Sequence, residues 1–393
     1  MFTNVINFIT FVIDFAFTFV IQTNAFVNFS SLNYREIKEL SVHGRYITTA
    51  QLQSFLKGDS IKNNVSLLGK STQDRLIHKV TLGRGNIKIL MWSQMHGNET
   101  TTTKAILDLI NYLQKGTDFT DHILTSVTLT IIPVLNPDGA VVYTRENAHM
   151  VDLNRDALEL SQPESRILRT VYDHIRPDYC FNLHDQRTIF SAGSIEKPAT
   201  LSFLAPAHDI QRNISGSREN SMKIIAAIHN AFSTLLPDQI GRYDDVFNPN
   251  CVGDTFQLMG TPTVLFEAGH FPDDYQRERT REFVFYALIK AILVIANNET
   301  EEYNVDDYFD IPENNKRYFD VLISNAQLIN KKYDHRIGIL YREVLNKKTI
   351  IFNPYIESTG ELKGKFGHKY FNCTDRNDLD FLKSDKQFRQ LLF

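Results

Sequence analysis

His96 and Glu99 are three positions apart in the segment WSQMHGNETTTTK, residues 92–104. In a turn or a first helical turn, residues i and i+3 point to the same side. Two donor side chains on one side of one segment can bind a single metal ion. An isolated His and Glu with this spacing are more often part of a solvated loop. A metal site therefore requires further ligands from elsewhere in the chain.

Two further residues with suitable chemistry end short apolar segments. His184 follows Phe-Asn-Leu in FNLHDQ, and Glu267 follows Val-Leu-Phe in TVLFEAGHF. A carboxylate beside such an apolar run is unusual, because carboxylates are rarely buried without a partner. Two histidines and one glutamate around zinc, with the fourth position open to water, form a catalytic ligand set.

Strands and helices alternate along the segment that must position these residues. Apolar runs predict strands at residues 86–92, 126–139 (ending in a turn), 178–185 and 262–269. Helices are predicted at residues 101–116, 161–175, 220–236 and 281–296. This alternation is typical of an α/β fold with a mostly parallel sheet covered on both faces. Because ligands bind at the carboxyl ends of strands in open α/β sheets, we expect the two histidines and two glutamates to gather there.

Both ends of the chain differ from this central part. Residues 1–31 are apolar and contain no Lys or Arg, since the first basic residue is Arg35. They are a poor membrane or signal segment, an added strand or helix, or a dispensable stretch with no role in the fold. Residues 300–393 are expected to form a C-terminal extension. It would contain an amphipathic helix at 316–332 and a β-hairpin at 336–358 that turns at residues 346–348.

The net charge and the cysteine content exclude some classes of function. The chain has 393 residues, a formal net charge of −4 and a pI near 6.3, with no basic block that would attract nucleic acid. Its three cysteines, Cys180, Cys251 and Cys373, argue against a disulfide framework and are compatible with a reducing compartment. We expect a cytoplasmic protein, with membrane anchoring or export through residues 1–31 as the alternative. The oligomeric state does not follow from the sequence.

Several short motifs occur in one characteristic order: HGNE, NPDG, TRENAHMVDLNRD, NLHD and FEAG. Over residues 80–295 this series resembles the zinc metallocarboxypeptidases, the carboxypeptidase A-like family. The short spacing from Asn136 to Arg155 is similar to that of its compact bacterial members. The resemblance implies an α/β fold with a mostly parallel, mixed eight-stranded sheet flanked by helices. The catalytic domain would span residues 32–299, followed by a small α+β extension.

The resemblance also implies a role for each motif residue. His96, Glu99 and His184 would bind Zn²⁺, and Glu267 would be the general base. Asn154 and Arg155 would bind the terminal carboxylate of the substrate. Arg145 would polarise the scissile carbonyl group, and Asp152 would hold the ring of His96 in position. These roles suit the chemistry, because zinc lowers the pKa of a bound water to about 7. A guanidinium binds a carboxylate through two hydrogen bonds, and a carboxylate often holds a zinc-bound histidine.

The residues that select a substrate are less defined. A tyrosine about 22 residues before the catalytic glutamate, typical of pancreatic relatives, has no clear counterpart here, although Tyr243 and Phe247 lie near. Gly253 and Asp254 are candidates for the side-chain pocket. Asp244 and Asp245 could favour a basic substrate group, and Arg187 could meet an acidic one.

The resemblance implies an enzyme, a zinc metallocarboxypeptidase that removes a C-terminal residue from a peptide. One alternative is an amidohydrolase or deacylase acting on N-acyl amino acids or murein peptides. Another is a non-catalytic zinc-binding interaction module. The presence of Glu267 and Arg145 disfavours that module, because a site without activity could have lost both.

Overall fold

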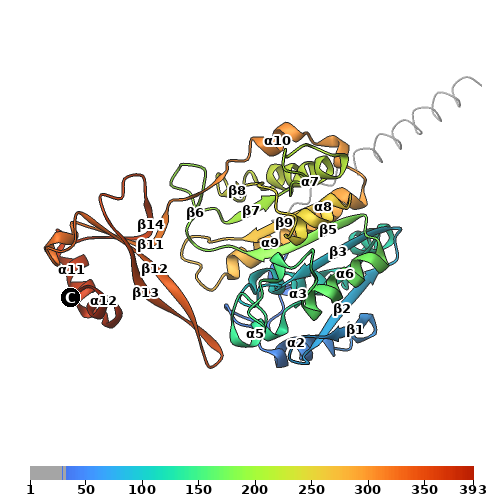
Figure 1. Cartoon of the computed structure of the whole chain (residues 1–393), viewed down its shortest axis with the longest axis horizontal. Coiled ribbons are helices and arrows are strands. Elements are labelled where there is room, and N and C mark those ends of the chain that lie inside the picture. The colour runs from blue at the N-terminus through green and yellow to red at the C-terminus, as the bar shows by residue number, and fades with distance from the viewer. Residues whose placement is uncertain (1–28, 30–31) are drawn as a thin grey trace, which may run out of the picture. The chain divides into compact units, whose positions relative to one another are not determined.

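The computed structural model describes residue 29 and residues 32–393 (Figure 1). The expectations for residues 1–31 therefore lie outside the described residues, apart from Phe29. The chain divides into a short unit, residues 1–36, and a large unit, residues 37–393. The described part of the short unit contains one 3₁₀ turn, Tyr34–Glu36. Among the described residues, no helix combines the length and apolar composition needed to cross a bilayer.

The large unit is built on an eight-stranded sheet in the order β1-β2-β4-β3-β5-β9-β7-β8. Its strands are β1 (Val65–Lys70), β2 (Leu76–Gly83), β3 (Ile87–Ser93), β4 (Val127–Ile132), β5 (Tyr179–Asp185), β7 (Leu201–Leu204), β8 (Ile240–Arg242) and β9 (Thr263–Ala268). The central strands β4, β3, β5 and β9 pair in parallel, whereas β1–β2, β2–β4 and β7–β9 are antiparallel. The predicted mixed, mostly parallel sheet is confirmed, and its centre carries the expected strands.

Helices lie on both faces of this sheet (Figure 1). They are α2 (Thr49–Leu56), α3 (Thr101–Leu113), α4 (Asp118–Ser126), α5 (Pro137–Val142), α6 (Pro163–Ile175), α7 (Gly216–Phe232), α8 (Val252–Leu258) and α9 (Glu278–Ala296). On the face covered by α6 and α8, Trp92 of β3 packs edge-on against Phe256, which stacks on Tyr172. These buried rings hold α8 against the centre of the sheet, close to the ends of the parallel strands.

The packing of α3 against α9 contains a fully buried ion pair. The guanidinium of Arg281 donates to both carboxylate oxygens of Asp108, at 2.6 and 2.5 Å. The same carboxylate accepts the backbone N–H of Glu39 at 2.7 Å. A second pair, Lys104 with Glu278 at 2.6 Å, joins the same two helices. Because a buried charge needs a partner, these contacts fix α3, the helix that begins just after Glu99.

The C-terminal part forms a second sheet of four strands in the order β13-β12-β11-β14. The strands are β11 (Tyr318–Ser324), β12 (Arg336–Asn346), β13 (Thr349–Gly360) and β14 (Phe366–Asn372), followed by α11 (Arg376–Ser384) and α12 (Lys386–Leu392). β12 and β13 form a long antiparallel hairpin, and β14 runs parallel to β11. The extension is therefore α+β, as predicted.

The helix predicted over residues 316–332 is wrong. That segment forms strand β11 and a 3₁₀ turn, Ala326–Leu328. Val321 and Ile323 are buried in the core beneath α11 and α12, while Phe319 and Leu322 pack in a second cluster. A central strand that is buried on both faces has a continuous apolar sequence. A short buried helix can have the same kind of sequence, so the pattern alone does not distinguish the two.

The boundary between the part built on the eight-stranded sheet and the C-terminal extension lies later in the chain than residue 300. α10 (Val305–Phe309) packs on α7, and β10 (Asn314–Lys316) pairs with β6 (Phe190–Ala192) beside the main sheet. The four-stranded sheet starts only at Tyr318. Residues 300–316 therefore belong structurally to the catalytic part of the chain.

We predict that Asp108→Ala lowers the free energy of unfolding by about 3–5 kcal/mol, because it removes one partner of a buried ion pair and two short hydrogen bonds to the Arg281 guanidinium, which keeps a longer pair with Glu278 at 3.3 Å. Chemical denaturation followed by circular dichroism measures the change. The matched control is Asp173→Ala, which removes the partly exposed pair with Arg169 and should cost less than about 1 kcal/mol. Equal effects of the two substitutions would contradict the structural role of Asp108.

Candidate active site

Three neighbouring parallel strands bring the candidate metal ligands together. His96 and Glu99 follow the carboxyl end of β3, and His184 lies near the end of β5. His184 and Glu267 are paired residues on β5 and β9, so their side chains emerge side by side on one face. The four residues gather at the carboxyl edge of the sheet, as the order of strands and helices predicted.

Local contacts set the orientation of His96 and Glu99. The N–H of Glu99 donates to the carbonyl of His96 at 3.1 Å, which closes a tight turn between them. Gly97 in this turn approaches the backbone so closely that a Cβ atom would lie 2.0 Å from the carbonyl carbon of Gly139. The side-chain amide of Asn136, in the NPDG motif, donates to the carbonyl of Met95 at 3.1 Å. The HGNE and NPDG motifs therefore pack on each other and fix the turn.

Asp185 joins this turn to β5. Its carboxylate accepts the N–H groups of Thr101 and Thr102 at 2.8 and 3.2 Å, at the start of α3. Its own N–H donates to Glu99 Oε2 at 3.2 Å. The residue next to His184 thus holds the helix that follows Glu99. Asp185 was not expected from the sequence, because its partners lie more than 80 positions away.

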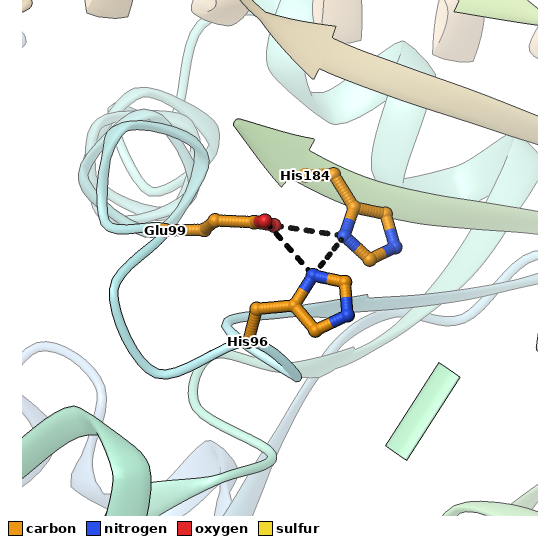
Figure 2. Close-up of side chains that lie close together, drawn as sticks. All are labelled: His96, Glu99 and His184. Atoms are coloured by element: carbon orange, nitrogen blue, oxygen red, sulfur yellow. Dashed lines mark hydrogen bonds and ion pairs between the residues drawn. The ribbon is translucent and has the colours of Figure 1, made fainter. Parts of the chain in front are cut away.

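The donor atoms of His96, Glu99 and His184 converge on one point (Figure 2). The two Nδ1 atoms are 3.1 Å apart, and each lies 2.8 Å from an oxygen of Glu99. All three side chains are buried. Two ring nitrogens that face each other at this distance cannot both carry a proton, whereas both can donate a lone pair to one cation.

Donor type and number suit zinc. Two imidazole nitrogens and one carboxylate leave an open position in a tetrahedral site. Burial opposes charge on His96, but Glu99 and Asp152 outweigh it and raise the pKa of His96. Burial also opposes charge on Glu99, yet the two histidines hold the pKa of that carboxyl well below its usual range. The cluster therefore has the negative charge and the donor geometry that a cation needs.

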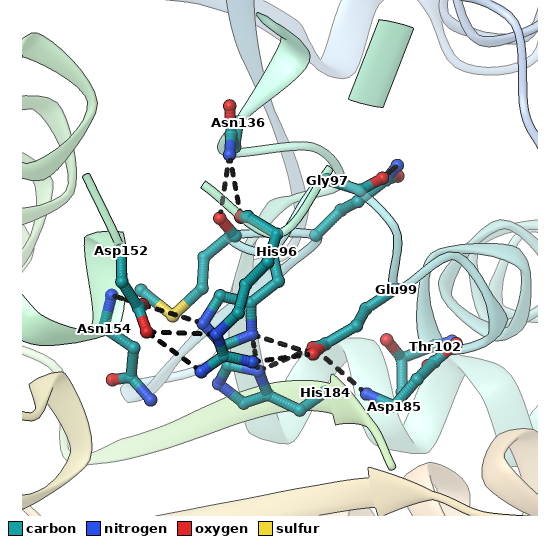
Figure 3. Close-up of polar contacts among 12 residues, drawn as sticks. His96, Gly97, Glu99, Thr102, Asn136, Asp152, Asn154, His184 and Asp185 are labelled. Carbon is teal, nitrogen blue, oxygen red and sulfur yellow. Dashed lines mark hydrogen bonds and ion pairs between the residues drawn. The ribbon is translucent and has the colours of Figure 1, made fainter. Parts of the chain in front are cut away.

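Asp152 contacts His96 on the side away from Glu99 (Figure 3). The Nε2 atom of His96 lies 3.0 Å from Asp152 Oδ1, so Nδ1 is left to face Glu99. Arg145 donates to Asp152 Oδ2 at 3.0 Å and reaches Glu99 at 3.5 Å. Burial alone would raise the pKa of Asp152, but the His96 hydrogen bond and the nearby positive charges lower it strongly. This contact is the one expected between a carboxylate and a metal-binding histidine.

Glu267 lies beside the cluster and has an unused oxygen. Its buried Oε2 atom forms no hydrogen bond with any described residue. Burial, followed by the charges of Glu99 and Asp185, raises the pKa of Glu267 well above its usual value. A cation at the neighbouring ligands would lower this pKa again, since opposite charge favours the ionised form. Its environment is that of a carboxyl group available for proton transfer.

Asn154 and Arg155 line the same cleft. Asp152 accepts the N–H of Asn154 at 2.9 Å, and Asn154 in turn accepts the N–H of Val252 at 3.0 Å. Arg155 is exposed and donates to the carbonyl of Asn154 at 2.7 Å. Within residues 32–393, no carboxylate forms an ion pair with Arg155, although the residue lines the cleft.

Some of the residues expected to select a substrate line the cleft, and others do not. Tyr243 lines the cleft, whereas Phe247 does not. Gly253 and Asp254 line it as well, and burial raises the pKa of Asp254 to about 6. Asp245 is not free to bind a basic substrate group, because Arg218 and Arg212 pair with it. The expectation that Asp245 favours a basic substrate group did not foresee these partners, which come from α7 and the segment before it.

The cleft has a volume of about 840 Å³ and is also lined by residues that belong to none of the sequence motifs. Arg45 and Tyr143 come from the N-terminal half of the large unit. Four others belong to the β12–β13 hairpin: Tyr341, Arg342, Glu343 and Tyr355. No local pattern marks them, because they reach the cleft only through contacts distant in sequence.

Comparison with known proteins agrees with this geometry. Residues 50–166 match the model of the zinc carboxypeptidase family. Carboxypeptidase SOL1 of Arabidopsis thaliana is 35% identical over 103 residues, which cover 23% of this chain and 21% of that protein. Carboxypeptidase 2 of Trichophyton rubrum is 28% identical over 108 residues, or 27% of this chain and 19% of its own length. The chain thus spans about a fifth of the length of these curated relatives.

A solved structure extends the comparison of the fold. The metallo-carboxypeptidase from Burkholderia cenocepacia superposes with a TM-score of 0.52 and 20% identity, covering 65% of this chain and 70% of that one. The family match contains His96, Glu99, Arg145, Asp152, Asn154 and Arg155, whereas His184 and Glu267 lie beyond it. Residues 50–166 of this chain are therefore similar in sequence to the zinc carboxypeptidase family, and a larger part of the chain shares the fold of a solved metallo-carboxypeptidase.

Proposed function

We propose that this chain is a zinc-dependent carboxypeptidase that hydrolyses the C-terminal peptide bond of a peptide. One observation carries the proposal: a buried ligand cluster, an ionisable carboxyl and an unpaired guanidinium share a single cleft. His96, Glu99 and His184 would hold zinc. Glu267 is the general base, and Asn154 and Arg155 bind the terminal carboxylate.

The residues around the cluster have complementary tasks. When bound, zinc supplies Lewis acidity and lowers the pKa of water from 15.7 to about 7. Glu267 takes a proton from the attacking water and transfers it to the leaving amine. Arg145 places positive charge beside the ligand cluster, where it stabilises negative charge developing on the scissile carbonyl oxygen. Asp152 keeps His96 and Arg145 in position through its two oxygens.

Arg155 supports an exopeptidase rather than an endopeptidase. A guanidinium recognises a carboxylate through paired hydrogen bonds, and a peptide carries such a group only at its C-terminus or on an acidic side chain. The size of the cleft favours a peptide over a small N-acyl amino acid, because its volume of about 840 Å³ extends beyond the ligand cluster and is lined by residues of both sheets. A non-catalytic zinc module would need neither Arg145 nor the unpaired oxygen of Glu267.

We predict that protein purified without chelator contains about one zinc per chain. The three converging donors motivate this value, and elemental analysis measures it. His184→Ala should lose the metal, because two remaining ligands do not close a tetrahedral site. The matched control is His174→Ala, an exposed residue of α6 outside the cluster. Full zinc content in the His184 variant would exclude the proposed ligand set.

We predict that Glu267→Gln lowers kcat by about 10²–10⁴ while zinc content and substrate binding are retained. The amide keeps the shape of the side chain and removes the base. Steady-state kinetics on a short peptide, together with metal analysis of the variant, test this. A kcat within threefold of the unsubstituted protein would assign proton transfer to another group.

We predict that Arg155→Ala raises KM and lowers kcat/KM, because the carboxylate contact exists both before and during the reaction. The variant should also lose the preference for a free over an amidated C-terminus. Arg169→Ala on α6 is the matched control, since Arg169 lies outside the cleft. If the unsubstituted protein cuts free and amidated peptides equally, Arg155 does not bind a terminal carboxylate and an amidase or endopeptidase activity replaces this proposal.

A further inference from the structure

The C-terminal sheet forms part of the catalytic cleft. Tyr341, Arg342 and Glu343 of β12 and Tyr355 of β13 line the cavity that also contains His96 and Glu267. On the hairpin, Leu340 pairs with Tyr355 and Arg342 with Asn353, so the side chains of Arg342 and Tyr355 lie on the same face of the two strands. A domain that is separate in architecture therefore supplies a wall to the site.

Specific contacts hold this wall in place. Tyr143 donates to Glu343 at 2.5 Å, and the nearly buried Arg45 forms an ion pair with the same carboxylate at 2.9 Å. Asp320 of β11 accepts the hydroxyl of Tyr275 at 2.9 Å and the N–H of Tyr341 at 2.7 Å. The contacts of Tyr143 and Arg45 tie the hairpin to the catalytic part of the chain. The Tyr275 contact ties β11 to that part, and the Tyr341 contact joins β12 to β11 within the C-terminal sheet.

A further contact lies beside the metal-ligand strand. His368 of β14 donates from Nε2 to the carbonyl of Thr188 at 2.8 Å. Thr188 follows Arg187, three residues after His184. The segment leaving the end of β5 is thereby fixed to the C-terminal sheet, and Arg187 stays next to the hairpin.

Two arginines in this region have no anionic partner. Arg187 donates to the hydroxyl of Tyr355 at 3.4 Å, and the guanidinium carbon of Arg342 lies 5.3 Å from the centre of the Tyr355 ring. Neither arginine forms an ion pair in the described ranges of the chain, whereas the nearby Glu343 is already paired with Arg45. We call the group formed by Arg187, Arg342 and Tyr355 the cationic wall. It offers two exposed guanidinium groups to whatever occupies the cleft.

The cationic wall and the carboxylate-binding pair belong to different parts of the lining. Asn154 and Arg155 are attached to the start of α8 through Val252, and the wall is attached to the hairpin and the end of β5. A peptide whose terminal carboxylate lies on Arg155 and whose scissile bond lies at the ligand cluster must continue along the rest of the cleft. Its residues on the N-terminal side of that bond would then meet the wall.

We propose that the cationic wall selects peptides with an acidic side chain on the N-terminal side of the scissile bond. The proposal rests on the proposed carboxypeptidase function and adds its substrate class. An Asp or Glu carboxylate matches the fork geometry of a guanidinium. Because both arginines are exposed, the interaction is moderate and weakens with salt. We expect an acidic residue to raise kcat/KM about threefold to tenfold over an isosteric amide.

The test compares peptides that share a neutral C-terminal residue and carry Glu or Gln at the first, second or third position before it. The unsubstituted enzyme should prefer Glu at one of these positions, and the preference should shrink as sodium chloride is raised from 50 to about 500 mM. Arg342→Ala should bring the Glu/Gln ratio towards one, and Arg342→Glu should invert it. Lys348→Ala at the tip of the same hairpin, outside the cleft, should leave the ratio unchanged.

The outcomes separate the two proposals. If the enzyme cuts the neutral peptides but treats Glu and Gln alike at all three positions, the cationic wall has no such role while the carboxypeptidase function stands. If the preference survives both Arg342 substitutions and Arg187→Ala, another group selects the acidic residue and the proposal fails. If no peptide is cut, the proposed function itself fails.

Discussion

The constraint on which the rest of this structure depends is the close approach of three buried metal-binding side chains. The Nδ1 atoms of His96 and His184 are 3.1 Å apart beside the carboxylate of Glu99. Lone pairs that face one another in a buried site repel unless a proton or a cation lies between them. One proton can satisfy only one pair of atoms, whereas one cation satisfies all three donors. The surrounding fold keeps these donors together.

Several elements share that task. Parallel pairing of β3, β5 and β9 brings the ends of three segments to one edge of the sheet and sets Glu267 in register with His184. Asp185 holds the start of α3, Asn136 holds the loop before His96, and Asp152 fixes the ring of His96. These carboxylates and amides are satisfied inside the protein. By contrast, Glu267 Oε2 has no hydrogen-bond partner and the Arg155 guanidinium has no anionic partner among the described residues. That contrast distinguishes groups that build the site from groups that face a substrate.

Much of this could be predicted from the sequence, because the information is local. The i, i+3 spacing of His96 and Glu99 and the apolar runs before His184 and Glu267 mark chemistry at strand ends. The buried strands β3, β5 and β9 are short, mostly apolar runs, and the helices α3 and α9 are longer, mostly apolar segments. The resemblance to a family supplied the individual roles, which spacing alone did not.

What the sequence did not predict depends on contacts between distant residues. Residues 318–324 form strand β11 and not the predicted helix, because burial on both faces gives an unbroken apolar run, Val321-Leu322-Ile323, without strand alternation. Asp245 is a candidate for a basic substrate group by its sequence, but α7 brings Arg218 to it. Glu343 and Arg45 are almost 300 positions apart, so no local signal connects the C-terminal sheet with the cleft. Tertiary packing determines these features, and a local sequence pattern does not contain that information.

The most direct test of the account is a crystal structure of the zinc-loaded protein with anomalous diffraction measured on both sides of the zinc absorption edge. The account predicts one strong anomalous peak bounded by His96 Nδ1, Glu99 and His184 Nδ1, with zinc–nitrogen distances of about 2.0–2.1 Å and Glu267 next to the open position. A peak at another place, ligation through the Nε2 atoms, or Glu267 as a fourth protein ligand that closes the site would contradict it.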